Sequence, residues 1–321
     1  MFLWLLLLTV VVTAGWFPGV SYSQQVRLSY SGVSGQNLPF WVTYEAGLYK
    51  KYGLDAEMVL ISGGLTNIQA LLANEIAFTY LGGASPIQAT IQGADVAILA
   101  TAYGLMPYGL IAGKNIHSAE ELKGKRIAVS RVGGIEETAA RVALDRLGVG
   151  ARYVSFLQAG PDPVRIAAVE SGAAQATMLA PPGLFTATAR GLNLLADLGS
   201  LKIKYPTSVI AARRFYLTKD RPVAKKYLMA MVEGLQLYRQ NKNFAVQVLQ
   251  KYTKQASPEI LSQTYDYFAK NTPVMPLTDP EAIQVALATD KPSNRKVEDF
   301  YDNSILEDLG REGFMKAITN K

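Results

Sequence analysis

The residues of this sequence best suited to chemistry lie in four short loops rich in glycine and serine. The loops cover residues 31–40, 62–64, 82–85 and 130–134, and each follows a short apolar run. Glycine lets a ligand approach the backbone closely, and a serine hydroxyl adds a hydrogen-bond donor without filling the space. A single loop of this kind is explained by a tight turn that needs a positive φ angle. Four of them at equivalent strand ends favour one shared binding site.

Polar side chains that could contact a ligand stand at the same strand ends. Arg131 directly follows a predicted strand, so its guanidinium could lie at the mouth of a cleft and bind both oxygens of a carboxylate or sulfonate. A solvated or ion-paired position on the rim is the alternative for this arginine. Gln158 ends another predicted strand, and Asn37 could cap the helix whose first turn contains Pro39. These residues predict that a small molecule binds at one edge of a sheet.

The composition excludes several kinds of chemistry. The 321 residues include no cysteine and one histidine, His117, which excludes thiol nucleophiles, disulfides, cysteine-ligated metals and histidine-rich metal sites. No loop has the spacing of a phosphate-binding or dinucleotide-binding glycine motif, and no G-x-S-x-G elbow occurs. Glu136 and Glu137 lie in the first turn of a predicted helix, where the helix dipole stabilises carboxylates. We therefore expect no metal, no cofactor and no enzymatic activity.

Short β-favouring runs alternate with stretches of helical period from Val26 onward, which predicts parallel strands joined by helices. The predicted strands cover residues 26–30, 56–61, 76–81, 96–102, 126–130, 152–157 and 175–179. The predicted helices cover residues 40–52, 65–73, 86–92, 136–147, 163–171 and 183–190. A further helix is expected at Ser118, where Glu121 completes a capping box. Ligands of such sheets bind beyond the carboxyl ends of the strands, where the glycine-rich loops lie.

The alternation of strands and helices ends near residue 198, and residues 220–321 have helical periodicity. We therefore predict an α/β fold of two βα lobes joined by a hinge, with a helical C-terminal region. Lobe 1 is expected to comprise residues 24–108 and 205–321, and lobe 2 residues 109–204. The chain would return to lobe 1 through residues 207–216, and its two crossings between the lobes would form the hinge.

The N-terminal segment is typical of a secretory signal peptide. Residues 1–14 are almost entirely apolar and are followed by Gly15, Pro18 and small residues up to Ser23. We predict a signal peptide of residues 1–23, cleaved before Gln24, although no Lys or Arg precedes the apolar run. An uncleaved membrane anchor is the alternative, but the run is short for a membrane span. The net charge of +6 comes from scattered Lys and Arg, so we expect no nucleic-acid partner and only a general preference for anions.

Several segments between residues 26 and 215 resemble one known family. Pro39 and Phe40 with EAGLYKKYGLD at residues 45–55, and residues 62–64, 69–73, 93–96, 122–129 and 178–182, resemble the sulfonate-, taurine- and nitrate-binding proteins of ABC importers. That family also includes relatives of the yeast thiamine-pyrimidine synthase. The resemblance implies a type II periplasmic-binding fold that closes around its ligand, with contacts from residues 37–38, 83–85 and 131–134. The complete candidate ligand-binding set is Asn37, Leu38, Gly64, Gly83, Ala84, Ser85, Arg131, Gly133, Gly134 and Gln158.

The resemblance implies the substrate-binding component of an ABC importer, which captures a small organic solute and delivers it to an inner-membrane permease. We expect a monomer, exported to the periplasm, and a sulfonate- or carboxylate-like anion as the ligand. A periplasmic sensor for a signalling partner and a binder of a pyrimidine thiamine precursor are the alternatives. The synthase branch acts through a histidine and a cysteine-rich motif that have no counterpart here, so its activity is not expected.

Overall fold

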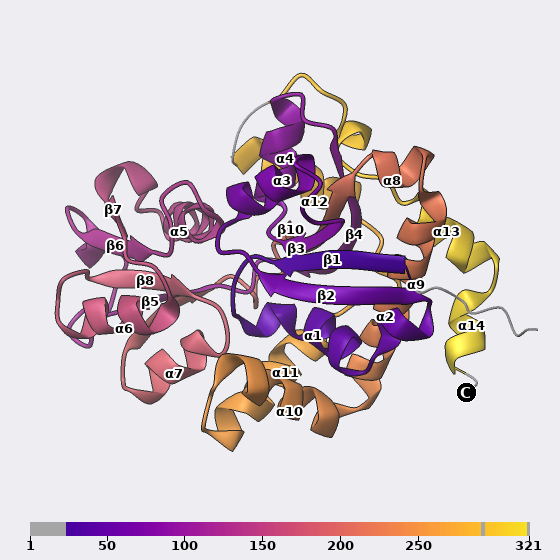
Figure 1. The fold of residues 1–321 in the computed structure, drawn as a ribbon. Coiled ribbons are helices and arrows are strands. Elements are labelled where there is room, and N and C mark those ends of the chain that lie inside the picture. The colour runs from indigo at the N-terminus through magenta and orange to yellow at the C-terminus, as the bar shows by residue number, and fades with distance from the viewer. Residues whose placement is uncertain (1–23, 290–292, 320–321) are drawn as a thin grey trace, which may run out of the picture.

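The computed structural model describes residues 24–289 and 293–319. The predicted signal peptide of residues 1–23 lies outside the described residues. Two five-stranded sheets lie side by side, and Figure 1 shows the second sheet with its helices at the left of the molecule. The first sheet has the order β2 (Leu54–Leu60), β1 (Gln24–Tyr30), β3 (Phe78–Leu81), β10 (Lys204–Arg213), β4 (Val96–Leu105). The second has the order β7 (Ser155–Gln158), β6 (Arg126–Val129), β8 (Ala176–Leu179), β5 (Gly109–Ala112), β9 (Asn193–Asp197).

The two sheets share one topology. In each, three parallel strands are followed by a strand that has entered from the other sheet, β10 in the first and β5 in the second. Both entering strands pair antiparallel with their two neighbours. The chain therefore crosses between the sheets twice, between β4 and β5 and between β9 and β10. The α/β fold with two βα units and a helical C-terminal region is confirmed.

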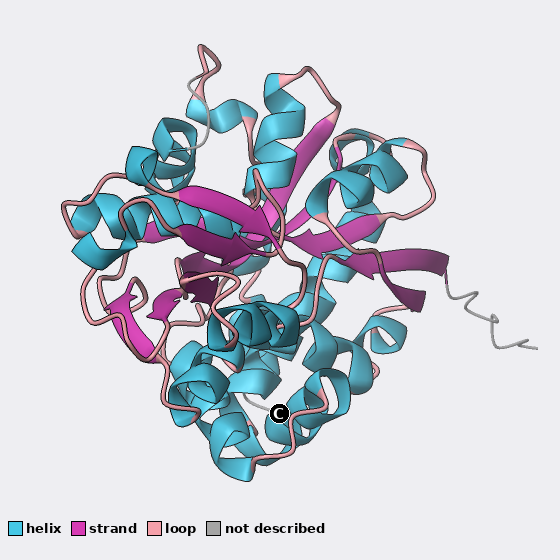
Figure 2. Ribbon diagram, turned by 90° about the vertical axis from the view of Figure 1, so that its left-hand side faces the viewer, coloured by secondary structure: helices cyan, strands magenta, loops and turns pink. Residues whose placement is uncertain are grey.

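Helices cover both faces of the sheets, as the turned view in Figure 2 shows. Those of the first βα segment are α1 (Leu38–Glu45), α2 (Leu48–Lys51), α3 (Gly64–Leu72) and α4 (Ala84–Ile91). The second sheet carries α5 (Ile135–Arg146), α6 (Asp162–Glu170) and α7 (Gly183–Ala189). The C-terminal region contributes α8 (Phe215–Thr218), α9 (Arg221–Gln240), α10 (Lys242–Thr253), α11 (Pro258–Ala269), α12 (Pro280–Thr289), α13 (Ser304–Arg311) and α14 (Phe314–Thr319). These C-terminal helices pack on the first sheet and on the helices that cover it: α12 lies against β10, and α9 lies against α1.

Aromatic side chains hold the core between the first sheet and α9. The ring of Tyr227 stacks on Phe78 with centroids 4.2 Å apart, and Phe40 stacks on Tyr80 at 5.3 Å. All four side chains are essentially inaccessible to solvent. Each large side chain buried in this way contributes about 1.5–3 kcal/mol through removal of apolar surface from water. This rigid core fixes the start of α1 and the end of β3, which face the second sheet.

Three details of the predicted elements are wrong. The expected helix over residues 40–52 is two helices, because Gly47 adopts a left-handed φ of +67° between them. The helix expected at Ser118 is a single 3-10 turn at Glu120–Leu122, although Ser118 Oγ does donate to Glu121 at 2.9 Å. The sheets are mixed rather than parallel, because β5 and β10 run antiparallel to the other strands of their sheets. The predicted strands do not include β5, β9 or β10; residues 207–216 of the sequence were expected only to return the chain to the first lobe.

Candidate functional site

The loops after the parallel strands of the two sheets meet. A side chain at Gly82, after β3, would contact Ile135 Cδ1 at the start of α5, at 4.0 Å. The backbone N–H of Gly35, in the 3-10 turn η1 (Gly35–Asn37) that precedes α1, donates to the carbonyl of Pro181 after β8 at 3.1 Å. Gln255 Nε2 donates to the Thr186 hydroxyl at 3.1 Å beside this contact. We call each sheet with the helices packed on it a unit, the first unit being that of β1 and the second that of β6. These contacts show that the two units are closed on one another along the carboxyl ends of their strands.

The candidate residues Gly64, Ser85 and Arg131 lie close to the line where these loops meet. A Cβ atom at Gly64 would lie 2.8 Å from Ser85 Cβ, so only glycine lets α3 approach the start of α4 at this point. The Arg131 side chain crosses to the first unit, where its Nη1 lies 3.1 Å from the position of a Cβ atom at Gly63. Arg131 is exposed. Contact of this guanidinium with a ligand stays a prediction.

The residues at the start of α1 and α4 are packed into the first unit. Leu38 is fully buried in the core, and the Asn37 side chain donates to the carbonyl of Gly32 instead of capping α1. Gly83 N–H donates to the carbonyl of Pro206, on the entering strand β10, at 2.8 Å. Ala84 then begins α4. These contacts tie the candidate loops to the strand through which the chain returns from the second unit.

The loop after β6 satisfies part of its own hydrogen bonding. Gly133 has a left-handed φ of +77°, and its N–H donates to Glu137 Oε2 at 2.8 Å. Gly134 N–H donates to the carbonyl of Arg131 at 3.1 Å. Gln158 is exposed, and its Oε1 accepts from Val132 N–H at 3.3 Å. The loop is thus preformed by its own side chains before any ligand binds.

A buried ionic cluster that the sequence analysis did not select lies at the same edge of the second sheet. Arg165 on α6 has a side chain that is only 3% exposed and forms an ion pair with Asp162. Its Nη1 lies 3.6 Å from Glu136 Oε1, and Ser130 Oγ donates to Glu136 Oε2 at 2.7 Å. Desolvation raises the pKa of Asp162 even though its side chain is 30% exposed, and the Arg165 guanidinium opposes that rise. The cluster places one cation and two carboxyl groups beneath the loops.

Polar atoms of the first unit face this cluster across Tyr108, which is 3% exposed. Burial, with the Glu136 carboxylate next, raises the pKa of Tyr108, while the charge of Arg165 and a hydrogen bond with the Gln36 side chain lower it. Tyr80 donates to the carbonyl of Gln36 at 2.9 Å. The region is therefore a polar layer at the boundary, beside an apolar cluster that itself runs from the first unit, at Leu81, into the second, at Met178.

Several buried polar atoms in this layer have no hydrogen-bond partner. They are Arg165 Nε and Nη1, Gln36 Oε1, Ser34 Oγ and Ser208 Oγ. Buried polar groups are nearly always paired, so unpaired ones at one place mark a site that a ligand or water completes. The sequence holds a signal for Arg165, because Asp162, Arg165, Ile166 and Val169 have the i, i+3, i+4, i+7 spacing of one helix face. An arginine on an otherwise apolar face is predicted to be buried.

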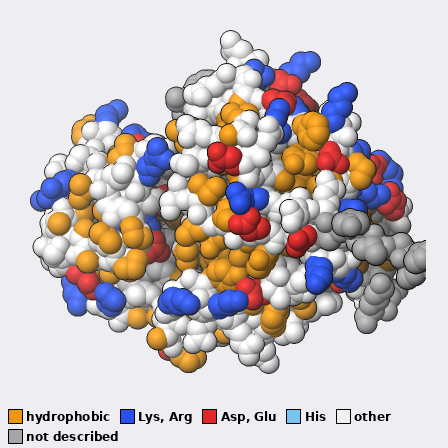
Figure 3. All heavy atoms as spheres, viewed as in Figure 1, with side chains coloured by type: hydrophobic (Ala, Val, Ile, Leu, Met, Phe, Trp, Pro, Cys, Tyr) orange, Lys and Arg blue, Asp and Glu red, His pale blue; other side chains and the backbone are white. Residues whose placement is uncertain are grey.

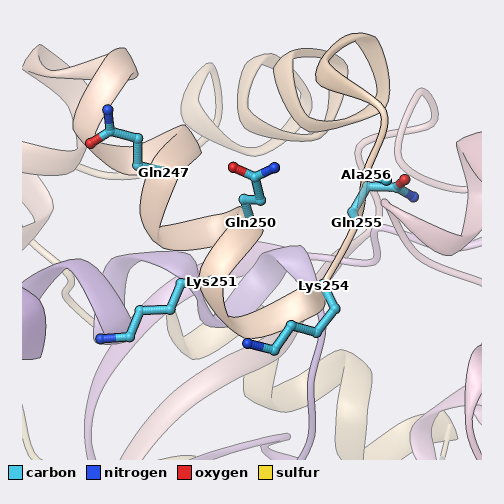
Figure 4. Close-up of a pocket in the computed structure, with 6 residues that line it drawn as sticks. All are labelled: Gln247, Gln250, Lys251, Lys254, Gln255 and Ala256. Carbon is cyan, nitrogen blue, oxygen red and sulfur yellow. The ribbon is translucent and has the colours of Figure 1, made fainter.

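Depressions of the surface lie elsewhere. One of about 450 Å³ is formed by the end of α10 and the loop that follows, as Figure 4 shows. Its lining consists of Gln247, Gln250, Lys251, Lys254, Gln255 and Ala256. Lys251 is engaged by Glu45 on α1 at 2.7 Å. The depression is open to solvent, and of the predicted ligand-binding residues it includes none, so it is not the candidate site.

The described residues hold no cluster of three or more His, Asp or Glu side chains suited to a metal ion. Among the helices of residues 24–289 and 293–319, none has the length and apolar character needed to cross a membrane.

Hydrophobic side chains gather on the face shown in Figure 3, beside the boundary between the two units. In the loops at the strand ends, Val33 is 47% exposed and Val132 is 51% exposed. Apolar side chains thus stand on both sides of the closed boundary.

Comparison with known proteins gives a consistent result. Residues 35–244 match the model of the family described as NMT1/THI5 like. A binding protein of Brucella abortus (strain 2308) is 28% identical over 219 residues, which are 66% of this chain and 66% of the relative, just under two thirds of its length. A solved structure from Bordetella bronchiseptica RB50 has a TM-score of 0.78 at 16% identity, covering 90% of this chain and 97% of that one. The periplasmic sulfonate-binding protein SsuA of Methylobacillus flagellatus KT has a TM-score of 0.72 at 18% identity, covering 92% and 97%.

Proposed function

The chain belongs to the NMT1/THI5-like family, and from this premise we propose that it is the solute-binding component of an ABC importer. The observation that carries the proposal is the polar layer at the boundary of the two units, where Arg165 of the second unit and Gln36 of the first have buried hydrogen-bonding atoms without partners. The fold shared with SsuA supports the same role. A solute-binding protein that closes around its ligand needs a site formed by both units, and residues of both units form the polar layer.

The mechanism follows from the two chain crossings. Contacts such as Gly35 to Pro181 exist only when the units are closed, so a solute that touches both units stabilises the closed form by its differential affinity. The open form exposes the site to solute, and the closed form removes it from water. A permease in the membrane then distinguishes the closed form from the open one. The exposed Val33 and Val132 flank the boundary on either side and are suited to contact that permease.

We propose that the solute is a small organic anion with a sulfonate or carboxylate group. The residues of the predicted set that line the boundary, Gly64, Ser85 and Arg131, would form its outer wall. The remaining residues of the set would shape the loops that carry them. Export to the periplasm and action as a monomer belong to the same proposal.

A thermal-shift screen tests the proposal, because a ligand that binds only the folded state must raise the melting temperature. The purified protein lacking residues 1–23 would be tested against sulfonates, carboxylates, nitrate and pyrimidines. A shift with one chemical class, absent in S85W and G133W variants that melt like the parent, is the expected result. A shift that both variants retain would refute the assigned boundary. No shift with any of these classes would refute the solute classes and favour a sensor that recognises a protein partner.

A further inference from the structure

The buried guanidinium of Arg165 has N–H groups that lack hydrogen-bond partners, which is unusual for a buried arginine. It is 3% exposed, and Nη2 makes its hydrogen-bonded ion pair with Asp162. Nη1 lies 3.6 Å from Glu136, too far for a hydrogen bond, and Nε has no partner. An arginine side chain with five N–H donors is costly to bury unless those donors are satisfied. The structure therefore holds a fixed cation whose donors on two nitrogen atoms are unused.

The surroundings fix this guanidinium in place. Asp162 holds one end, and Gly183 at the start of α7 leaves the room that the Asp162 carboxyl group occupies, since a Cβ atom at Gly183 would lie 2.9 Å from Asp162 Cγ. Glu136 is itself held by Ser130 at 2.7 Å. Because the neighbours of Arg165 are anchored, its free N–H groups keep a constant direction.

The opposite unit supplies acceptors and hydroxyls near the same place. Gln36 Oε1 and Ser34 Oγ are buried without partners, and Gln36 approaches the hydroxyl of Tyr108, which also lies in the field of Arg165. The Gly35 to Pro181 hydrogen bond brings this turn against the loop that precedes Gly183. Unused donors in the second unit and an unused acceptor in the first unit therefore belong to segments that this hydrogen bond joins across the boundary.

We propose that Arg165, rather than the exposed Arg131, binds the acid group of the solute, and that Gln36 Oε1 accepts a hydrogen bond from a hydroxyl or amino group of the same molecule. This inference rests on the proposed function. The ligand class is a carboxylate or sulfonate that also carries an O–H or N–H donor. Asp162 and Glu136 already share the charge of Arg165, so an acid group is favoured only through hydrogen bonds to the unpaired Nε and Nη1 donors, and one acid group per molecule is expected.

Chemical modification tests the role of Arg165 without knowledge of the ligand. Phenylglyoxal reacts with accessible guanidinium groups, and the protein would be unfolded and refolded beforehand to remove bound solute. If Arg165 lines a cleft that opens, it reacts within about tenfold of the rate of the exposed Arg190 in spite of its burial in the closed form. If Arg165 stays unmodified when Arg190 has reacted completely, it is a structural core residue and the inference is overturned. The proposed function would survive that result.

Binding of matched compounds tests the ligand class. Titration calorimetry would compare 2-hydroxyethanesulfonate with ethanesulfonate, and 4-hydroxybenzoate with benzoate. Binding at least about fivefold tighter by one hydroxylated compound than by its plain counterpart, about 1 kcal/mol, is expected for one added hydrogen bond. Equal binding within both pairs, or binding by none of the four, would overturn the ligand class.

Variants then separate the two arginines from general damage. R165K keeps the charge that Asp162 needs and loses the fixed fork, so affinity for the compound that binds should fall at least tenfold. R165M leaves Asp162 without its counter-charge and can unfold the second unit, so its melting curve is recorded first. R190K, a substitution of the same kind on α7, should leave affinity unchanged. Full affinity in R165K would assign the solute to the rim and overturn the inference.

Discussion

Gly83→Ala tests the link between the candidate loops and the returning strand. A Cβ atom at Gly83 would lie 2.8 Å from Pro206 Cγ and 2.9 Å from Pro206 Cβ, and closer still to the Pro206 carbonyl oxygen. Ordinary carbon contacts are about 3.5–4.0 Å, so α4 and β10 must separate by about 1 Å. The separation breaks the 2.8 Å hydrogen bond from Gly83 N–H to Pro206, which is worth about 1 kcal/mol. Overpacking adds about 1–3 kcal/mol, so we expect G83A to lower the free energy of unfolding by about 2–4 kcal/mol.

Urea denaturation of G83A and of G82A measures this effect. The neighbouring Gly82 is the matched control, because a Cβ atom there meets its nearest neighbours, Thr207 O and Ile135 Cδ1, at 3.8 and 4.0 Å, which are ordinary contacts. Gly83 has a φ of −63°, so backbone strain does not contribute to its substitution. G82A should stay within about 1 kcal/mol of the parent. If G83A and G82A have the same free energy of unfolding, the packing of Gly83 on Pro206 does not hold the loop as argued.

Three further perturbations probe closure, ionisation and docking. A Cβ atom in G35A would lie 2.5 Å from Thr264 Cγ2 and 2.7 Å from Phe268 Cε2 on α11, and 2.9 Å from the Pro181 carbonyl, so the turn η1 must move from its place at the boundary. In a variant whose melting curve shows that it is folded, calorimetry should record a loss of ligand affinity of about tenfold or more, and unchanged affinity would mean that this contact does not define the closed form. Burial raises the pKa of Asp162 above the ordinary aspartate value of 3.8, so the folded state binds this proton more tightly than the unfolded state. The free energy of unfolding should therefore fall as pH rises from 3.8 through the pKa of the folded state. D162N should flatten this slope in urea titrations between about pH 3.5 and 6, and an unaltered slope would assign it to other groups. V33D should leave ligand affinity intact and reduce uptake by cells, and full uptake would place the permease contact elsewhere.

The periodicity of the sequence predicted most of the fold. Alternating apolar runs and helical stretches located the parallel strands and the helices between them to within a few residues, because burial on both faces of a parallel strand leaves a continuous apolar run. The strands β5 and β9 were missed, since a strand of four or five residues has too short a pattern to be distinguished from a loop. The ten-residue strand β10 was missed as well, because it is buried along almost its whole length and so has no polar alternation. The break at Gly47 depended on one left-handed residue within an otherwise helical pattern.

The candidate site was determined by the sequence only in its outline. Glycine and serine after strands located the loops, because backbone conformation and strand ends are local properties that residue types reveal. Which arginine is buried is a tertiary property. Arg131 stands at a strand end and is exposed, whereas Arg165 is buried on the face of α6 that also buries Ile166 and Val169. The meeting of Gln36 with this cluster required two crossings of the chain between the sheets, and no local pattern encodes which loops those crossings bring together.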